Sequence, residues 1–391
     1  MIALKIALFT DTCLPQINGV AIYISDVIKV LSKEHEVVLF APGEGRLRME
    51  RVSPRLKIWW IPSSPFPFYE GYRIASLNYM KISSLLKKEK PDVVHAHAPI
   101  NLGLQGIVAA KRMHIPVVAT YHTHYPEYVP HLLSGKLPGV LRRATARTAK
   151  SFVKHTFGMA DVVTAPTEEL VEELCSYGMN NVVHLPNGID LAKLDCTKKE
   201  VMAFRKAHRI PAGKKVVLYL GRISFEKRLD RLLAAFKSIE KRDRVLVIAG
   251  GGPYLKSFME LAKSLKIRNI IFTGYLKHGN LGAAYCCADI FTSASDSETF
   301  GLTFVEAMYA GVPVIGVGRL GPKDIIKDGR NGILVTPGDT DCLARAMEKL
   351  LVHPELRKKM GKEARKTSLG YSIERSAQRT VELYRSLGAG R

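Results

Sequence analysis

Two glutamates lie eight positions apart in the segment SETFGLTFVEAMYAG, residues 297–311. Glu298 precedes a Phe-Gly-Leu turn, and Glu306 lies inside the apolar run that follows. Carboxylates accept hydrogen bonds from hydroxyl groups such as those of a sugar, which a cation cannot do. A structural role is equally open, because a helix dipole favours a carboxylate in the first turns and Glu298 can act as a cap. The pair therefore indicates either a site for a polyhydroxyl ligand or two well-placed helix residues.

An anion site is expected beside these glutamates. The run LTFVEAMYAG predicts a helix that begins at Leu302 and ends at Gly311. Unpaired backbone N–H groups at a helix start attract anions, and Gly301 lets a ligand approach the backbone closely. One carboxylate on the helix and another beside the anion site suit a nucleotide sugar, with the ribose at one and the hexose at the other.

Two cations are predicted at the end of an earlier strand. In LYLGRISFEKRLDRLLAAF, residues 218–236, a strand ends at Gly221 and a turn carries Arg222 and Lys227. A guanidinium fork and a point-charge ammonium together can neutralise a diphosphate. Spacing alone favours two solvated loop charges; the neighbouring anion site shifts the interpretation towards a phosphate-binding pair.

The elements that must position these residues are short, continuous, β-branched runs alternating with helical patterns. The expected strands are KIALFT, EVVLFAP, LKIWWIP, DVVHAHAP, IPVVATYH, DVVTAPT and NVVHLPNG, then KVVLYLGR, RVLVIAGGG, NIIFTGY, DIFTSAS, VPVIGVG and GILVTPG. Such runs are typical of buried parallel strands in βαβ units. They predict two doubly wound α/β domains, 1–188 and 189–370, followed by a last helical segment, 371–391. In such sheets ligands bind beyond the carboxyl ends of the strands, which predicts a cleft between the two domains.

The net charge of +22 favours an anionic partner. Between Glu127 and Asp161 the chain has no acidic residue. The cations of this stretch are Lys136, Arg142, Arg143, Arg147, Lys150 and Lys154. They interleave with apolar positions at roughly helical spacing, namely Val140, Leu141, Ala144, Thr148, Phe152 and Val153. This pattern is compatible with a helix lying on an anionic membrane and with an amphipathic helix that has a solvated basic face.

The six cysteines form no CxxC pair or regular framework, which predicts reduced thiols in a cytosolic protein. No apolar run reaches the length of a membrane span. The start MIALKIALFTDT predicts a first strand ending in a polar turn and not a signal peptide. We therefore expect a cytoplasmic protein, bound peripherally at the cytosolic face of the cell membrane.

An ordered set of motifs runs along the chain: DTCLPQINGVA, HAHAPINLG, YHTHYPEY, PNGID, GRISFEK and AGGGP, then the two glutamates in an E-x7-E pattern. This set resembles the retaining nucleotide-sugar glycosyltransferases of family 4, and the resemblance covers essentially the whole chain. It implies the GT-B fold, in which two Rossmann-like domains face each other, the first on the acceptor side and the second binding the nucleotide sugar. It also implies that the last helix, here within residues 371–391, crosses back onto the first domain. In this family the donor sugar keeps its configuration.

The resemblance also implies roles for individual residues. Gly19 brings backbone against the donor diphosphate, which Arg222 and Lys227 grip. Glu306 binds the ribose hydroxyls. The transferred sugar is contacted by Glu298 and by the backbone amides of Phe300, Gly301 and Leu302.

The same resemblance places His122 near the reacting sugar carbon, in preference to His124. His97, Tyr125 and Tyr128 become candidates for the acceptor side. The alternation of His95 and His97 at a strand end favours a buried, hydrogen-bonded histidine at each of these two positions. Positioned cations and helix amides can stabilise a departing diphosphate, so we expect no metal, and no cofactor beyond the nucleotide-sugar co-substrate.

The motifs most resemble glucosyltransferases that act on diacylglycerol. The leading hypothesis is transfer of glucose from UDP-glucose to a membrane glycerolipid such as diacylglycerol. Alternatives are a GDP-mannose-dependent mannosyltransferase acting on a phosphoinositol lipid, and a nucleotide-sugar epimerase of the same fold that has no acceptor. Nucleic acid is not expected as a partner, because only the charge suggests it and no binding motif or aromatic stacking array is present.

Overall fold

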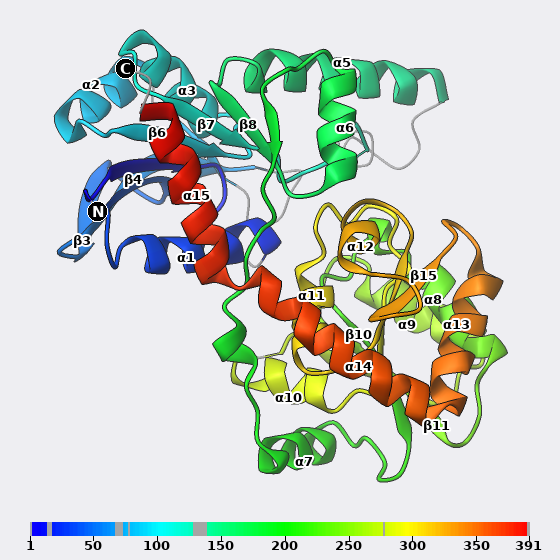
Figure 1. The fold of residues 1–391 in the computed structure, drawn as a ribbon. Coiled ribbons are helices and arrows are strands. Elements are labelled where there is room, and N and C mark those ends of the chain that lie inside the picture. The colour runs from blue at the N-terminus through cyan, green and yellow to red at the C-terminus, as the bar shows by residue number, and fades with distance from the viewer. Residues whose placement is uncertain are drawn as a thin grey trace. The chain divides into compact units, whose positions relative to one another are not determined.

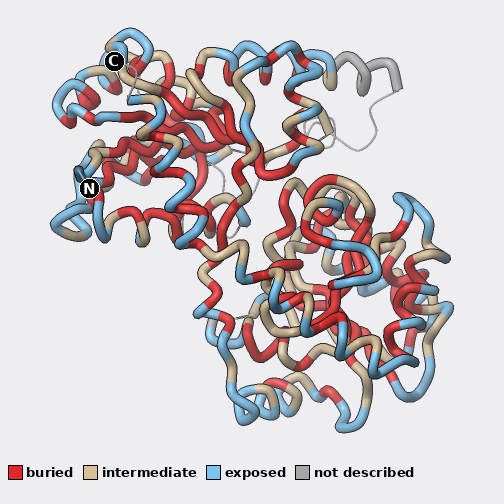
Figure 2. Tube along the Cα trace, viewed as in Figure 1, coloured by how far each residue is buried: buried red, intermediate tan, exposed pale blue. Residues whose placement is uncertain are grey.

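The computed structural model describes residues 2–13, 18–66, 73–76, 79–127, 139–276 and 278–388. The chain forms two compact units (Figure 1): Met1–Gly188 with Ile373–Arg391 makes the first, and Ile189–Ser372 makes the second. Each unit is built around its own sheet. Figure 2 shows the buried residues concentrated along the strands of both units.

The sheet of the first unit has the strand order β3-β4-β2-β1-β6-β7-β8-β9, with β5 paired to β4. Its strands are β1 (Lys5–Thr10), β2 (Glu36–Gly43), β3 (Arg48–Ser53), β4 (Leu56–Pro65), β5 (Arg73–Ala75), β6 (Val93–His97), β7 (Val117–Thr120), β8 (Val162–Ala165) and β9 (Val182–His184). Pairing is parallel from β4 through β2 and β1 to β9, and antiparallel only at β3–β4 and β4–β5. The parallel strands are apolar without alternation because helices cover them.

The helices of the first unit are α1 (Gly19–Leu31), α2 (Tyr79–Glu89), α3 (Leu102–Arg112), α5 (Gly139–Phe157), α6 (Glu168–Ser176) and α15 (Ile373–Gly388). The last of these comes from the far end of the sequence and packs on α1 (Figure 1). Its buried face joins one hydrophobic core with residues of α1 and β1. The hydroxyls of Tyr23 and Ser376 lie 3.3 Å apart across this contact.

The second unit has an all-parallel sheet in the order β12-β11-β10-β13-β14-β15. Its strands are β10 (Lys215–Leu220), β11 (Arg244–Ala249), β12 (Ile270–Gly274), β13 (Ile290–Thr292), β14 (Val314–Val317) and β15 (Gly332–Val335). Its helices are α7 (Lys198–Ala207), α8 (Leu229–Ser238), α9 (Leu255–Ser264), α10 (Leu281–Cys286), α11 (Leu302–Tyr309), α12 (Leu320–Ile325), α13 (Thr340–Val352) and α14 (Pro354–Ser368). Alternate residues of β10 enter two separate cores. Val216 and Leu218 lie in one core, and Val217 and Tyr219 lie in the other. Both faces of this sheet are therefore buried, as the continuous apolar runs predict.

The predicted fold class, two doubly wound parallel α/β domains, is confirmed. Strands β3 and β5 are additions that the apolar pattern did not predict. Every residue of β3 is exposed except the half-buried Ser53, so the strand carries no apolar signal. Its backbone pairing with β4 is what makes it a strand.

The expectation that all six cysteines are reduced thiols was wrong for two of them. Cys196 and Cys286 form a disulfide within the second unit. They are 90 residues apart in sequence, and only the packing of α10 beside the segment that precedes α7 brings them together. Such a pairing leaves no local spacing pattern.

Candidate active site

The loop after β10 carries Arg222 and Lys227 at the carboxyl end of the strand, the edge where parallel sheets bind ligands. This loop packs backbone to backbone on the loop after β11, where the N–H of Gly221 donates to the carbonyl of Ala249 at 3.0 Å. A Cβ at Gly250 would lie 1.9 Å from the carbonyl oxygen of Gly221, so only glycine permits this approach. The GRISFEK and AGGGP motifs therefore form one pair of loops.

A buried tyrosine fixes the conformation of the first loop. The residue Tyr219 is only 2% exposed, and its hydroxyl donates to the carbonyl of Arg222 at 2.9 Å. Burial raises the pKa of Tyr219, and the carboxylates of Glu298 and Glu226 raise it further, so the hydroxyl stays a donor. The Arg222 side chain is half-buried.

Lys227 and Glu298 form an ion pair. The ammonium nitrogen lies 2.7 Å from one carboxylate oxygen, and the two side chains are only 20% and 16% exposed. The segment that carries Glu298 is also held at Asp296, two residues earlier. Arg231 pairs with the Asp296 carboxylate at 3.0 Å, and Arg319 donates to the Asp296 carbonyl at 3.1 Å. Two predicted donor-binding residues, 71 positions apart, thus meet at one place.

The start of α11 has the geometry expected of an anion site. Gly301 adopts φ +89° directly before Leu302, and as the N-cap residue it has no side chain with which to cap the helix. Phe300 is buried, and a Cβ at Gly321 would lie 1.9 Å from its carbonyl oxygen. The N–H of Gly321 also donates to the carbonyl of Glu298 at 2.9 Å. The turn from Glu298 to Leu302 is therefore held against the start of α12.

Glu306 lies in the second turn of α11, where the hydroxyl of Tyr285 donates to its carboxylate at 2.5 Å. Tyr285 is fully buried on α10, and burial together with the Glu306 carboxylate raises the pKa of its hydroxyl. Sequence reasoning did not find Tyr285, because the pairing exists only once α10 packs against α11. The contact holds one carboxylate oxygen in place and leaves Glu306 half-buried.

The first unit gathers three histidines at the ends of β6 and β7. His97 Nδ1 lies 2.9 Å from His122 Nε2, and the ring centroids are 5.2 Å apart. His95 bonds through both ring nitrogens, to Tyr384 and to Thr120, each at 2.6 Å. Burial lowers the pKa of His122 to about 3, and burial with the charges of the neighbouring histidines lowers that of His97. All three rings are therefore neutral near pH 7.

His124 lies in a different environment. Its Nε2 is 2.7 Å from a Glu173 carboxylate oxygen on α6, and its Nδ1 is 3.3 Å from Glu127. Burial alone would lower the pKa of His124, but the two carboxylates raise it to about 9. His124 is thus a charged residue that ties its loop to α6. Among the described residues, no group of three or more His, Cys, Asp or Glu side chains converges as a metal site would.

The remaining candidates of the first unit are only partly described. Gly19 is exposed and begins α1, and the preceding Asn18 caps that helix by accepting from the N–H of Ala21 at 2.9 Å. Tyr125 is buried, and its ring packs edge-on against Tyr121 with the centroids 5.6 Å apart. Tyr128 and Lys136 lie outside the described residues, as do the side chains of Arg142 and Arg143 on α5.

Asp11 is a residue that the sequence analysis missed. Its buried carboxylate accepts hydrogen bonds from the backbone N–H groups of Ile100, Asn101, Leu102 and Gly103, at 2.6–3.3 Å. It thereby caps α3 and holds the loop that follows His97. An aspartate directly after an apolar first strand was the available signal, but its partners are about 90 residues away.

The predicted basic helix exists as α5, and its inner face matches the expected one only in part. Ala149, Val153 and Phe157 are buried at spacings of four. Of the apolar positions expected from spacing, Val153 is thus buried and Thr148 and Phe152 are exposed, and the side chains of Val140, Leu141 and Ala144 lie outside the described residues. Phe157 of this stripe packs against the rings of Tyr121 and Tyr125, and the ring of Phe152 lies edge-on to Tyr125. The exposed residues of the other face include Arg147, Lys150, Phe152 and Lys154.

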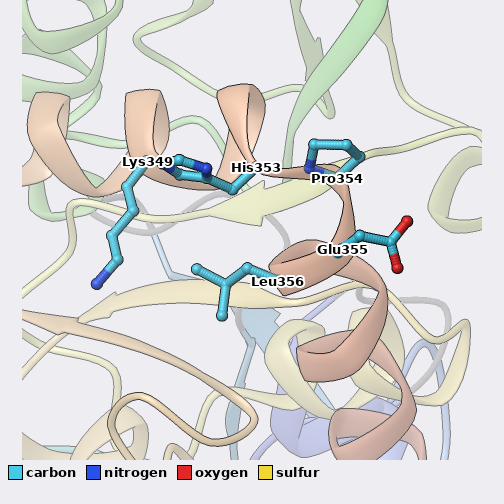
Figure 3. Close-up of a pocket in the computed structure, with 5 residues that line it drawn as sticks. All are labelled: Lys349, His353, Pro354, Glu355 and Leu356. Atoms are coloured by element: carbon cyan, nitrogen blue, oxygen red, sulfur yellow. The ribbon is translucent and has the colours of Figure 1, made fainter.

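A surface hollow of about 460 Å³ lies where α13 ends and α14 begins (Figure 3). It is lined by Lys349, His353, Pro354, Glu355 and Leu356. It arises because the non-helical His353 separates two helices. It shares no residue with the predicted site, and we assign it no role.

Two family profiles together match most of the chain. The profile "Glycosyltransferase Family 4" matches residues 17–193, and the profile "Glycosyl transferases group 1" matches residues 201–367. The chain is 34% identical to the alpha-monoglucosyldiacylglycerol synthase of Streptococcus pneumoniae over 364 residues, which cover 90% of this chain and 80% of that protein. It is 31% identical to a GDP-mannose-dependent alpha-mannosyltransferase of Mycobacterium tuberculosis, over 95% and 94% of the two chains.

Solved structures share the fold at lower identity. A sucrose-phosphate synthase from Thermosynechococcus elongatus superposes with a TM-score of 0.78 at 20% identity, covering 99% of this chain and 100% of the other. The Anabaena protein HepE, in complex with UDP-glucose, superposes with a TM-score of 0.77 at 18% identity, covering 97% and 99%.

Proposed function

The chain belongs to the glycosyltransferases of group 1 and family 4, and we propose that it transfers glucose from UDP-glucose to a membrane glycerolipid such as diacylglycerol. The observation that carries the donor half of this proposal is the meeting of Lys227, Glu298 and the start of α11. The lipid half rests on the similarity to the Streptococcus pneumoniae enzyme, whose name states a glucosyldiacylglycerol product.

The donor diphosphate binds Lys227 and Arg222, with the first N–H groups of α11 completing its coordination. Lys227 is paired with Glu298, so the donor phosphate competes with the Glu298 carboxylate for the Lys227 ammonium and displaces it. Glu298 then becomes free to accept hydrogen bonds from hydroxyls of the transferred sugar. Glu306, steadied by Tyr285, accepts from the ribose hydroxyls.

In the transfer itself the bond between the anomeric carbon and the diphosphate oxygen breaks, and a bond to the acceptor oxygen forms. The acceptor hydroxyl proton passes to the departing diphosphate, which leaves from the same face. The residues that hold the diphosphate stabilise its growing negative charge, which is the largest contribution expected in such a reaction. His122 contacts the sugar near the reacting carbon.

Helix α5 supplies the attachment to the membrane surface. Arg147, Lys150 and Lys154 present exposed cations, and the exposed ring of Phe152 lies among them in the sequence. Basic residues combined with an aromatic side chain suit the headgroup region of an anionic bilayer. Among the described helices, none combines the length and apolar character needed to cross a bilayer.

A mannosyltransferase is the second candidate, because the Mycobacterium tuberculosis relative aligns over nearly the full length of both chains. Radiolabelled UDP-glucose and GDP-mannose, each incubated with the protein and either diacylglycerol or phosphatidylinositol vesicles, separate the two. We expect label from UDP-glucose in a diacylglycerol product. Label only from GDP-mannose on phosphatidylinositol would replace the proposal with its rival, and no labelled lipid in any arm would contradict both.

A further inference from the structure

The three buried histidines of the first unit differ in how well their ring nitrogens are bonded. His95 and His97 are two positions apart on β6, so both side chains project from the same face of the sheet. His95 is bonded at both nitrogens, to the hydroxyls of Tyr384 and Thr120. His97 bonds only through Nδ1, to His122 Nε2 at 2.9 Å, and its Nε2 is buried with no hydrogen-bond partner among the described residues.

The backbone around His97 is held tightly. Ala98 adopts φ +48°, a left-handed conformation that is costly for a residue with a side chain, and its N–H donates to the Thr120 carbonyl at 3.1 Å. The Asp11 carboxylate accepts hydrogen bonds from the backbone N–H groups of residues 100–103, which follow shortly after Ala98. The backbone that carries the His97 ring is therefore held in place, and the ring itself is held by its 2.9 Å contact with His122.

The protons of the His97–His122 pair can be counted. A neutral imidazole carries one N–H, so the 2.9 Å contact between two neutral rings needs one proton between them. If His97 Nδ1 donates, His122 accepts at Nε2 and carries its own proton on Nδ1. If His122 Nε2 donates, His97 must instead carry its proton on the buried Nε2.

The second arrangement leaves a buried N–H without an acceptor among the described residues. Orphaned buried N–H groups are among the rarest features of folded proteins. The first arrangement leaves only a bare ring nitrogen at the same position, with no polarised hydrogen to satisfy. The contacts therefore favour donation from His97 to His122.

We propose that His97 is a positioning residue that fixes His122 as the neutral tautomer protonated on Nδ1. Because Nε2 of His122 is then occupied, the ring offers the substrate a hydrogen-bond donor and not a base. The contact between His122 and the substrate rests on the proposed function. The tautomer of His122 does not, because it follows from contacts within the first unit. A donor at this place would hold a sugar hydroxyl or ring oxygen and would take no proton from the acceptor.

The test is long-range ¹H–¹⁵N correlation spectroscopy of the full-length protein labelled at histidine, with His122 assigned by comparison with His122→Gln. We expect a His122 signal with a protonated Nδ1 and a bare Nε2 at neutral pH. A protonated Nε2 with a bare Nδ1, or a doubly protonated ring, would overturn the proposal. Since no donor or acceptor is added, this result does not depend on the identity of the sugar or the lipid.

Two substitutions and a control extend the test to turnover. His97→Phe removes the bond to His122, so both tautomers of His122 should appear, and kcat should fall about tenfold, the cost of one net hydrogen bond. The KM for the nucleotide sugar should stay unchanged. His97→Asn keeps an N–H near the Nδ1 position and should restore both the single tautomer and most of kcat.

Tyr384→Phe is the matched control, because it removes one buried hydrogen bond from His95 in the same cluster. It should leave the His122 signals and kcat as they are. An unchanged His122 tautomer in His97→Phe would contradict the positioning role. If that variant failed to fold, the tautomer of the unaltered protein would still decide the question.

Discussion

Lys227 and Glu298 neutralise each other at 2.7 Å in a partly buried setting, and in the proposed mechanism the donor phosphate competes with Glu298 for the ammonium. The pair thereby links phosphate binding to the freeing of a carboxylate that suits a sugar hydroxyl. Residue types and spacing predicted both members, but not that they touch. Tyr219 and Tyr285 donate hydrogen bonds to the Arg222 carbonyl and the Glu306 carboxylate. Neither tyrosine carries a sequence signal of its own, because each lies in an ordinary apolar run.

Replacing Lys227 with Ala should reduce turnover by at least about a hundredfold, because it removes a cation that stabilises the leaving diphosphate. Initial rates with UDP-glucose measure this. Lys241→Ala is the matched control, since Lys241 also forms a 2.7 Å ion pair, with Glu348, in the same unit. Equal losses of turnover in the two variants would contradict the role of Lys227 in binding the diphosphate.

The buried histidines predict an acid-sensitive first unit. Their pKa values lie below the ordinary 6.5, at about 3 for His95 and His122, so their stabilising contribution is complete above pH 6.5 and is lost as the pH falls towards 3. The free energy of unfolding should fall by about 1.4 kcal/mol per pH unit for each proton taken up. Urea midpoints at pH 7 and pH 5 measure the loss.

His122→Phe should flatten this pH dependence, and the exposed His353→Gln in the second unit should leave it unchanged. A midpoint that stayed constant or rose on acidification would show that the three rings are not buried in the neutral form.

At the scale of elements, the strands of both parallel sheets could be predicted because burial on two faces makes them continuous apolar runs. Strand β3 could not, because its side chains are exposed and its pairing with β4 is the whole reason it forms. The inner face of α5 was predicted only in part: spacing assigned both Val153 and Phe152 to it, and Val153 is buried whereas Phe152 is exposed. The rings of Tyr121 and Tyr125, which come from another part of the chain and pack against Phe157, are contacts that the spacing does not show.

The exposed face of α5 leads to a prediction on membrane binding. Arg147→Ala combined with Lys154→Ala removes two cations, each worth about 1 kcal/mol near an anionic surface, so binding should weaken by about tenfold or more. Co-sedimentation with vesicles of phosphatidylglycerol and phosphatidylcholine, at low and high salt, measures it. The double variant Lys358→Ala and Lys359→Ala changes the charge equally on α14 and serves as the control. Binding insensitive to salt, or weakened equally by both double variants, would exclude α5 as the attachment site.

At the scale of the molecule, each unit closes its own core, and the first unit needs the end of the chain to do so. Helix α15 contributes Ile373, Ala377, Val381 and Tyr384 to the core that contains α1. The sequence predicts a last amphipathic helix from its apolar face, and only the family resemblance predicts that this helix crosses back onto the first domain. Spacing cannot show this, because the contacts concerned join residues more than 300 positions apart along the chain, such as Tyr23 and Ser376.

A chain that ends at residue 372 should therefore lose protection in the first unit alone. Hydrogen exchange should accelerate in peptides from α1 and β6, because their buried partners are removed, while peptides from β10 to β14 stay protected. Acceleration spread evenly over both sheets would contradict the division into two units that fold around separate sheets.

The donor site is the claim on which the functional account depends. The most direct measurement is a crystal structure of the protein with UDP bound. We expect the diphosphate to contact Lys227, Arg222 and the first N–H groups of α11, with Glu298 released from Lys227 and the ribose on Glu306. UDP bound elsewhere, with the Lys227–Glu298 pair intact, would contradict the account.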